Sequence, residues 1–145
     1  TGAAMLSQEE KDLLVSIWES IAPDAEEIGA EALLRMFTCF PKTKTYFAHL
    51  DISPGSAHLR THGKKIIMAV GDGVKNISTL ATTLAPLSLL HAYQLMIHPS
   101  NFKLLSHCIL VTLSCRRPQE FTPVAHGAWD KLLSAVSAVL AEKYR

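Results

Sequence analysis

The stretch LRTHGKKIIMAV, residues 59–70, places a histidine on the apolar side of a helix. His62 precedes Ile66 by four residues and Val70 by eight, so the three side chains share one helical face. An imidazole on such a face is a buried structural residue, a metal ligand, or a polar group that faces a ligand in a dry pocket. The remaining sequence decides among these interpretations.

The composition is that of a chain with a packed core. The 145 residues are 48% hydrophobic and carry a formal net charge of +1, and no basic run is longer than the Arg116–Arg117 pair. This charge pattern gives no electrostatic reason to expect nucleic acid as a partner. The longest apolar stretch, residues 104–115, contains polar side chains and is too short to span a bilayer, so we expect no membrane partner either.

The three cysteines, Cys39, Cys108 and Cys115, have no CxxC spacing and cannot all pair with one another. This usage favours a reduced, intracellular compartment in which the thiols behave as small apolar residues. A reactive thiol stays open as an alternative.

Hydrophobic periodicity predicts an all-α fold. Ser7 and Glu10 have the spacing of a capping box, and no segment alternates with the period of two that a strand requires. A short helical turn and an irregular corner are expected between Pro41 and Ser56. The six longer helices are expected from the cap at Ser7 to the break at Pro23, from about residue 24 to Pro41, over about 57–75, 80–95 and 98–115, and from Pro123 through Leu140.

Recognisable catalytic and metal motifs are missing from the sequence. His58 and His62 stand four residues apart, a spacing that can chelate zinc on a helix, but no third ligand stands nearby and the glutamate of a metalloprotease helix is absent. The sequence also lacks a nucleophile elbow, a P-loop and a GxGxxG motif. We therefore expect no catalytic residues.

His91 is a second histidine on an apolar face, because Leu87 and Leu95 flank it by one turn on each side. Taken alone, it is interpreted as a buried structural histidine. Together with His62, it places two imidazoles on apolar faces of separate helices, with the aromatic pair Tyr46–Phe47 in the corner before them. That arrangement suits a flat apolar cofactor whose iron takes a nitrogen ligand.

A set of motifs then occurs in a familiar order. They are FPKTKTYFAHLDISPGSA (40–57), HGKK (62–65), LHAYQL (90–95), NFKLLSHCILVTL (101–113), EFTP (120–123) and EKYR (142–145). Through them the chain from about Leu6 to Arg145 resembles the vertebrate haemoglobin subunits of the alpha type, within the globin family. The resemblance implies a globin fold of six to eight helices around a haem pocket. Residues 1–145 would form a single globin domain, with residues 1–5 as an N-terminal extension.

The resemblance also implies a cofactor, haem b (iron protoporphyrin IX). His91 would be the proximal iron ligand, and His62 would be the distal residue facing bound O2. Phe47 would stack on the porphyrin, and Ile66, which stands where the family usually has valine, would crowd the gas. The other residues expected at the haem are Tyr46, His49, Lys65, Leu87, Leu90, Leu95, Ile97, Asn101, Phe102, Leu105 and Leu140, with His49 and Lys65 near the propionates.

In function, the resemblance implies reversible binding and transport of O2, with CO and NO as further ligands, and no enzymatic role. The chain would join a beta-type haemoglobin chain in an alpha2beta2 tetramer in the cytoplasm of red blood cells. Residues that match the tight subunit contact are Arg35, Phe40, His107, Cys108, Phe121, His126 and Asp130. Lys44, Tyr144 and Arg145 match groups at the sliding contact and the carboxyl terminus.

Two other functions stay open at this point. One is a globin that acts mainly in nitric-oxide or nitrite redox chemistry, and the other is a six-coordinate haem sensor in which His62 and His91 both bind the iron. The residues that match subunit contacts favour the carrier. A further implied feature is a close helix crossing at Gly29 and Gly63.

Overall fold

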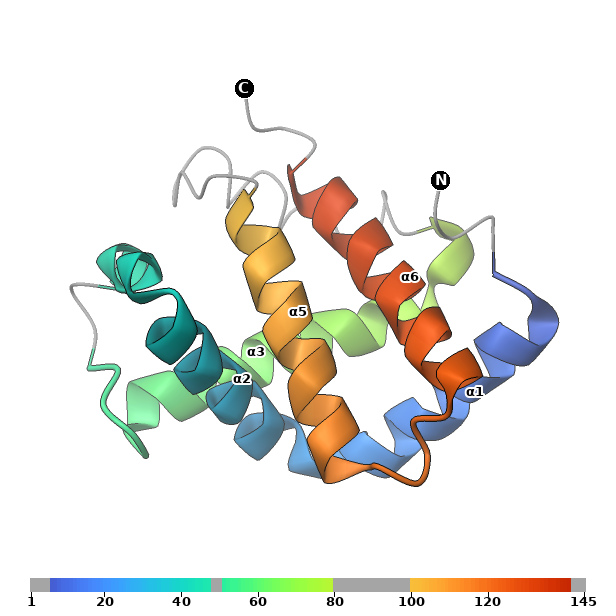
Figure 1. The fold of residues 1–145 in the computed structure, drawn as a ribbon, viewed down its shortest axis with the longest axis horizontal. Coiled ribbons are helices and arrows are strands. Elements are labelled where there is room, and N and C mark those ends of the chain that lie inside the picture. Colours follow the sequence, from blue (N-terminus) through green and yellow to red (C-terminus); the bar gives the residue numbers. More distant parts are fainter. Residues whose placement is uncertain (1–5, 48–50, 80–99, 142–145) are drawn as a thin grey trace.

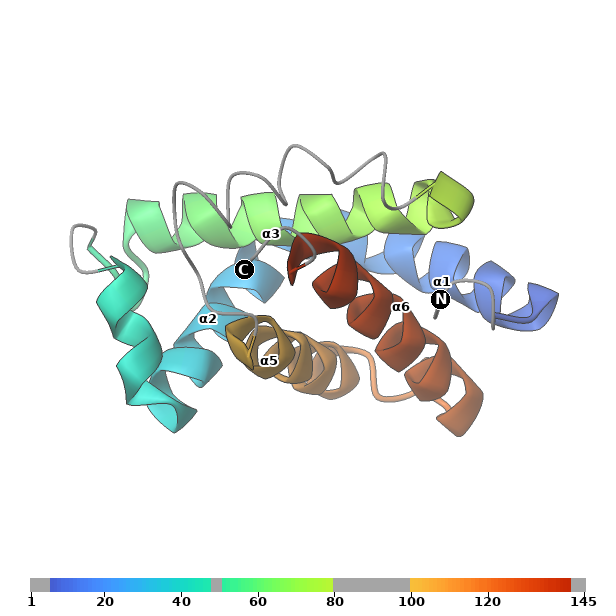
Figure 2. The same ribbon diagram turned by 90° about the horizontal axis from the view of Figure 1, so that it is seen from above.

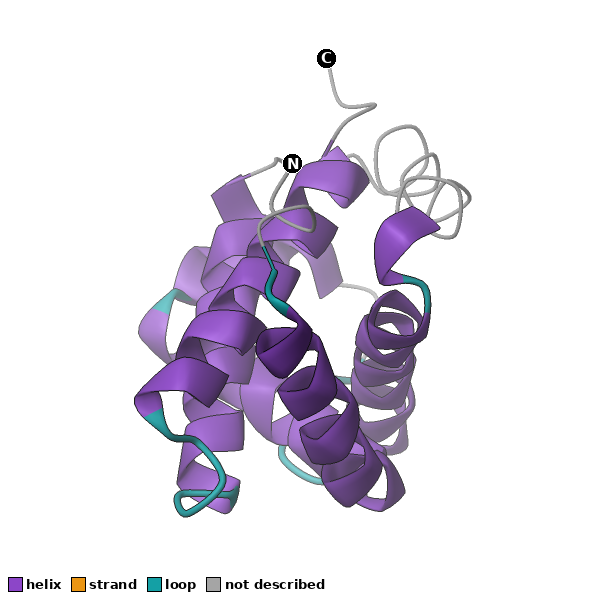
Figure 3. Cartoon of the chain, turned by 90° about the vertical axis from the view of Figure 1, so that its right-hand side faces the viewer, coloured by secondary structure: helices purple, strands orange, loops and turns teal. Residues whose placement is uncertain are grey.

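The computed structural model describes residues 6–47, 51–79 and 100–141, and every regular element in these ranges is a helix (Figure 3). The α-helices are α1 (Gln8–Ile21), α2 (Ala25–Cys39), α3 (Ala57–Lys75), α5 (Ser100–Arg116) and α6 (Pro123–Ala141). Short 3-10 segments are η2 (Ala22–Asp24), η3 (Pro41–Phe47) and η4 (Ile77–Thr79). The all-α prediction is confirmed. The helix expected over 80–95 and the N-terminal extension 1–5 lie outside the described residues, and the single-domain assignment stays a prediction.

The helices pack across one another from opposite faces of the molecule. In Figures 1 and 2, α5 and α6 lie side by side on one face of the molecule, while α3 runs along the opposite face. Helix α2 packs on both α3 and α5, and α6 packs on α1, α3 and α5. None of the helices in the described ranges is long and apolar enough to cross a membrane.

Helix α1 begins where the sequence predicts. The Ser7 hydroxyl accepts a hydrogen bond from the Glu10 backbone N–H at 3.1 Å, and the Glu10 carboxylate accepts one from the Ser7 N–H at 3.0 Å. This reciprocal capping box satisfies two N–H groups that have no partner within the helix. Glu10, only 8% exposed, also pairs with Lys131 at 2.9 Å and thereby ties α1 to α6.

Helix α6 supplies much of the core. It follows Thr122, whose hydroxyl accepts a hydrogen bond from the Ala125 N–H at 3.3 Å, and it starts at Pro123 as expected. Its buried face packs against α1 and α5, with Trp129 completely buried beside Phe121. The apolar residues Ala125, Trp129, Leu132, Leu133 and Val136 are buried, and Leu140 is half-buried.

The expectation that the cysteines behave as small apolar residues is confirmed for Cys108 and wrong for Cys39 and Cys115. Cys108 is buried among apolar side chains, whereas Cys39 and Cys115 are exposed. Periodicity alone did not separate them, because both exposed thiols stand on helices whose opposite faces are apolar.

Helices α2 and α3 approach backbone to backbone at Gly29 and Gly63. A Cβ atom built on Gly29 would overlap the carbonyl of Gly63, and one built on Gly63 would overlap the backbone of Gly29 and Ala30. Only glycine at both positions allows this crossing, which confirms the expectation for this pair.

We predict that Gly29→Ala lowers the free energy of unfolding by about 3 kcal/mol, because the added methyl group meets backbone atoms that cannot rotate away. The matched control is Gly127→Ala in α6, where an added Cβ meets no atom within 4 Å. There we expect a gain of about 0.5–1 kcal/mol. Urea titrations followed by circular dichroism measure both. Equal effects of the two substitutions would show that the crossing is not tight.

We also predict a pH-dependent contribution from Glu10. Its pKa lies below the ordinary 4.5, chiefly because of the hydrogen bond from Lys131 and also because of the Ser7 N–H. The stabilisation is therefore complete above pH 4.5 and disappears as the pH falls through the lowered value. Urea titrations of the wild type and of Glu10→Gln should differ at pH 7 and converge in acid. A difference that persists unchanged in acid would contradict this assignment.

Candidate functional site

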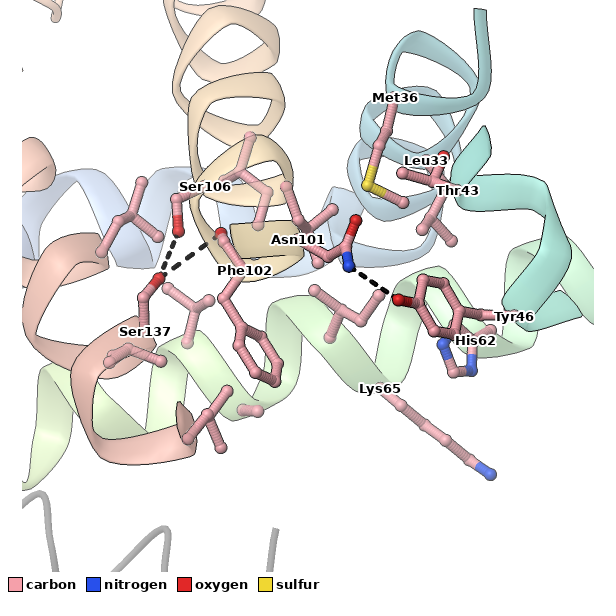
Figure 4. A pocket seen from close by; sticks show the side chains of 18 of the residues that line it. Leu33, Met36, Thr43, Tyr46, His62, Lys65, Asn101, Phe102, Ser106 and Ser137 are labelled. Carbon is pink, nitrogen blue, oxygen red and sulfur yellow. Dashed lines mark hydrogen bonds between the residues drawn. The ribbon is translucent and has the colours of Figure 1, made fainter. Parts of the chain in front are cut away.

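A pocket opens between α2, η3, α3, α5 and α6, where Leu33, Ile66 and Val136 come from three of the helices in its wall (Figure 4). Its volume is about 190 Å³. Because one water needs roughly 10–15 Å³, this space is far larger than a packing defect. The wall is predominantly apolar and includes a few polar side chains. Such a lining is typical of a site for a large apolar ligand that a few polar groups orient.

The structure gathers many of the residues that the sequence singles out. Those on the pocket wall are Tyr46, Phe47, His62, Lys65, Ile66, Asn101, Phe102, Leu105 and Leu140. They come from η3, α3, α5 and α6, so chain segments far apart in sequence meet here. The other predicted residues, His49, Leu87, Leu90, His91, Leu95 and Ile97, lie outside the described residues. The contact of each of these fifteen side chains with a cofactor stays a prediction.

His62 stands on the pocket side of α3, half-buried, in the turn that contains Gly63. Its ring centroid lies 5.0 Å from that of Phe47, with the ring planes at 76°. Phe47 in turn lies 5.2 Å from the buried ring of Phe37, at 67°. Edge-to-face contacts of this kind are the favoured arrangement of neighbouring aromatic rings. The chain of rings holds the imidazole from one side and limits its rotation.

Tyr46 and Asn101 join η3 to the first turn of α5 at the rim. The Asn101 side-chain N–H donates to the Tyr46 hydroxyl at 2.9 Å, as the dashed line in Figure 4 shows. Nearby, Thr43 is buried and donates its hydroxyl proton to the Phe40 carbonyl at 2.6 Å. The two bonds fix the 3-10 segment that carries Tyr46 and Phe47, so both aromatic rings have defined positions.

The α5 and α6 side of the pocket contains a pair of hydroxyl groups. Ser106 Oγ and Ser137 Oγ lie 2.7 Å apart, and Ser137 Oγ also lies 3.5 Å from the Phe102 carbonyl (Figure 4). The pair links α5 to α6 and satisfies polar groups that would otherwise face apolar neighbours.

Lys65 and Ile66 follow the distal position along α3. The Lys65 side chain is exposed and extends away from the apolar wall, where its ammonium group can meet a charged edge of a bound molecule (Figure 4). Ile66 is half-buried and stands one turn after His62 on the same face. Its side chain therefore borders the space in front of the imidazole.

Sequence reasoning missed part of the wall. The lining residues that it did not assign to the site are Leu33, Met36, Thr43, Ala69, Val70, Ser106, Ile109, Leu133, Val136 and Ser137. Leu33, Leu133 and Val136 belong to apolar helical faces, and such a face has the same sequence pattern whether it borders a pocket or a core. The sequence did not indicate that Ser106 and Ser137 belong to the site, because a serine hydroxyl on an inward helical face can form a hydrogen bond with many nearby backbone groups.

The zinc interpretation of the His58–His62 pair finds no support in the geometry. His58 lies on an exposed corner, where its Nδ1 accepts the backbone N–H of Asp51 at 3.4 Å. Within residues 6–47, 51–79 and 100–141, no three side chains of histidine, cysteine, aspartate or glutamate come together as a metal site. His62 lines the pocket instead.

Comparison with known proteins gives the family. The globin family model matches residues 30–140. The chain belongs to the globin family. It is 56% identical to haemoglobin subunit zeta of Homo sapiens over 140 residues, which cover 97% of the chain and 99% of that protein. It is likewise 56% identical to haemoglobin subunit alpha-D of Meleagris gallopavo (97% and 100% covered) and 54% identical to haemoglobin subunit pi of Gallus gallus (97% and 99%).

The described residues fit the group that the globin family implies. Haem is flat and largely apolar, with two carboxylates at one edge. The pocket offers an apolar wall, the Phe47 ring, an imidazole on one side and the Lys65 ammonium at the mouth. Apolar groups contribute most of the binding free energy of such a ligand, and the polar groups set its orientation.

Proposed function

We propose that the chain binds haem and carries oxygen reversibly as the alpha-type subunit of a haemoglobin tetramer. One observation supports this most strongly: His62 lines a largely apolar pocket in a chain that is 56% identical to haemoglobin subunits over nearly its whole length. The bound group would supply ferrous iron, whose chemistry is the reversible binding of O2.

Within this proposal, the two histidines have different tasks. His91, in the motif LHAYQL, would hold the iron through a ring nitrogen and leave the opposite side open. His62, as a neutral imidazole, would donate a hydrogen bond to the bound gas, which carries partial negative charge. The apolar wall would exclude water and protons and so limit oxidation of the iron.

A carrier is favoured over the two rival functions. The relatives are named as haemoglobin subunits, and the residues that match subunit contacts have no use in a monomeric redox enzyme or sensor. Among those residues, His107, His126 and Asp130 are exposed on the neighbouring helices α5 and α6, where a partner chain can reach them. We therefore propose the red-cell cytoplasm as the location and a beta-type chain as the partner.

We predict that His91→Gly abolishes retention of haem during gel filtration and that added imidazole restores it, because the free ring replaces the missing ligand. The matched control is His62→Gly, which should retain haem without imidazole. Absorbance of the haem band relative to protein measures both. Retention by His91→Gly in the absence of imidazole would contradict the proximal role.

We predict that His62→Leu accelerates O2 dissociation about 10- to 100-fold, because a hydrogen bond to a charged partner contributes roughly 1.5–3 kcal/mol. Dissociation of CO, which carries little charge, should change far less. His58→Leu, one turn earlier on α3 and exposed, is the control. Stopped-flow replacement of O2 by CO measures the rate. Unchanged O2 dissociation in His62→Leu would rule out the distal hydrogen bond.

We predict that Ile66→Val accelerates association of CO after flash photolysis, because the lost methylene opens the space in front of His62. One buried methylene is worth about 0.8 kcal/mol, so we expect a change of similar size, about fourfold. Ile67→Val makes the same chemical change on α3 at a buried position that does not line the pocket. Equal association rates in the wild type and Ile66→Val would refute this steric role.

A further inference from the structure

Helices α2 and α5 run antiparallel, and their polar contacts fix which residues face each other. The Arg35 guanidinium donates to the Thr112 hydroxyl at 2.7 Å, and the Arg116 guanidinium pairs with Glu31 at 3.1 Å. From Glu31 to Arg35 the chain advances by four residues, while on α5 the facing position moves back by four, from Arg116 to Thr112. Each further turn along this contact therefore adds four residues on α2 and subtracts four on α5.

One turn beyond the Arg35–Thr112 bond, this register places Cys39 opposite Cys108. Cys108 is only 3% exposed and packs in a cluster with Met36 and Phe37, which belong to the last turn of α2. Cys39 is the final residue of that helix and is exposed. A buried thiol on α5 thus lies beneath the helical turn that carries an exposed thiol.

The pKa of Cys108 also depends on Cys39. Burial is the main cause that raises the pKa of Cys108, the nearby Cys39 raises it further, and Arg35 opposes the shift. An electrostatic effect of one thiol on the other requires that the two sulfur atoms lie near each other. This agrees with the helix register.

We propose that Cys39 and Cys108 form a redox-active dithiol, which closes to an intramolecular disulfide when the isolated chain meets a disulfide oxidant such as glutathione disulfide. The sequence leaves a reactive thiol open, and the facing pair supplies the second sulfur that a lone thiol lacks. Neither the gas chemistry nor the haem takes part, so the proposal goes beyond the carrier function.

The reaction proceeds in two exchange steps. The Cys39 thiol loses its proton to solvent, and its sulfur attacks one sulfur of glutathione disulfide, which breaks that bond and releases one glutathione thiolate. The Cys108 thiol then loses its proton, and its sulfur attacks the Cys39 sulfur and releases the second glutathione. Two protein thiols are oxidised and one glutathione disulfide is reduced to two glutathione molecules. Excess reduced glutathione reverses both steps.

The positions of the two residues determine the order of attack. Cys39 is accessible to a tripeptide, whereas Cys108 is buried, so the first exchange takes place at Cys39. A disulfide spans only a short distance between the two backbones. Because Cys39 ends α2, its turn can adjust with fewer helical hydrogen bonds at stake than an interior turn.

The test uses the isolated full chain with haem, in the background of Cys115→Ser, which removes the exposed thiol elsewhere on α5. The chain is incubated with glutathione disulfide, and intact-mass and peptide mass spectrometry follow. We expect loss of both thiols, a mass lower by two hydrogen atoms, and one peptide that joins Cys39 to Cys108. Addition of excess reduced glutathione should restore both thiols.

Two variants give the intermediate its signature. In Cys108→Ala no second thiol can displace glutathione, so glutathione should remain attached to Cys39. In the chain that retains Cys108, this adduct should be about tenfold less abundant. In Cys39→Ser, which leaves the core untouched, Cys108 should stay reduced over the same time. A glutathione adduct on Cys39 that persists equally with and without Cys108 would overturn the proposal, as would disulfide-linked dimers in place of the internal bond.

Discussion

The contact between Gly29 and Gly63 is the constraint on which the rest of the site depends. Two helices meet there without side chains between them, so the distance and rotation of α3 relative to α2 have little freedom. His62 is the residue next to Gly63, and its direction is therefore set by the crossing itself. On the other side, the rings of Phe37 and Phe47 complete the fixation of the imidazole. The residue that we propose to meet a small ligand is thus held beside a tight helix crossing.

The polar and apolar side chains of the pocket wall have different roles. Most of its wall consists of aliphatic and aromatic side chains, and the polar groups are few. Among these, the Asn101–Tyr46 bond anchors η3 to α5, and the Ser106–Ser137 bond joins α5 to α6. These groups satisfy one another and so keep the helices in place without placing an unpaired polar atom against an apolar ligand. His62 lines the same pocket from α3.

The sequence predicted the helices well where local chemistry determines them. The Ser7–Glu10 capping box, Pro23, Pro41 and Thr122–Pro123 act within a few residues, and the helix ends follow these signals. The nine predicted residues that lie on the pocket wall came from motifs of the globin resemblance, and their contact with a cofactor stays a prediction. The serine pair and the exposure of Cys39 and Cys115 could not be predicted, because each depends on which helix lies opposite. That information is tertiary, and no local pattern encodes it.

The central claim is that one histidine holds the iron and the other leaves a coordination position open to gas. The ultraviolet–visible spectrum of the deoxygenated ferrous protein tests it directly, because five- and six-coordinate ferrous haem absorb differently. The account predicts the single broad visible band of five-coordinate iron, which changes to a two-band spectrum when O2 is admitted and returns when it is removed. A six-coordinate spectrum in the absence of any gas would contradict it, because it would mean that His62 itself occupies the position assigned to O2.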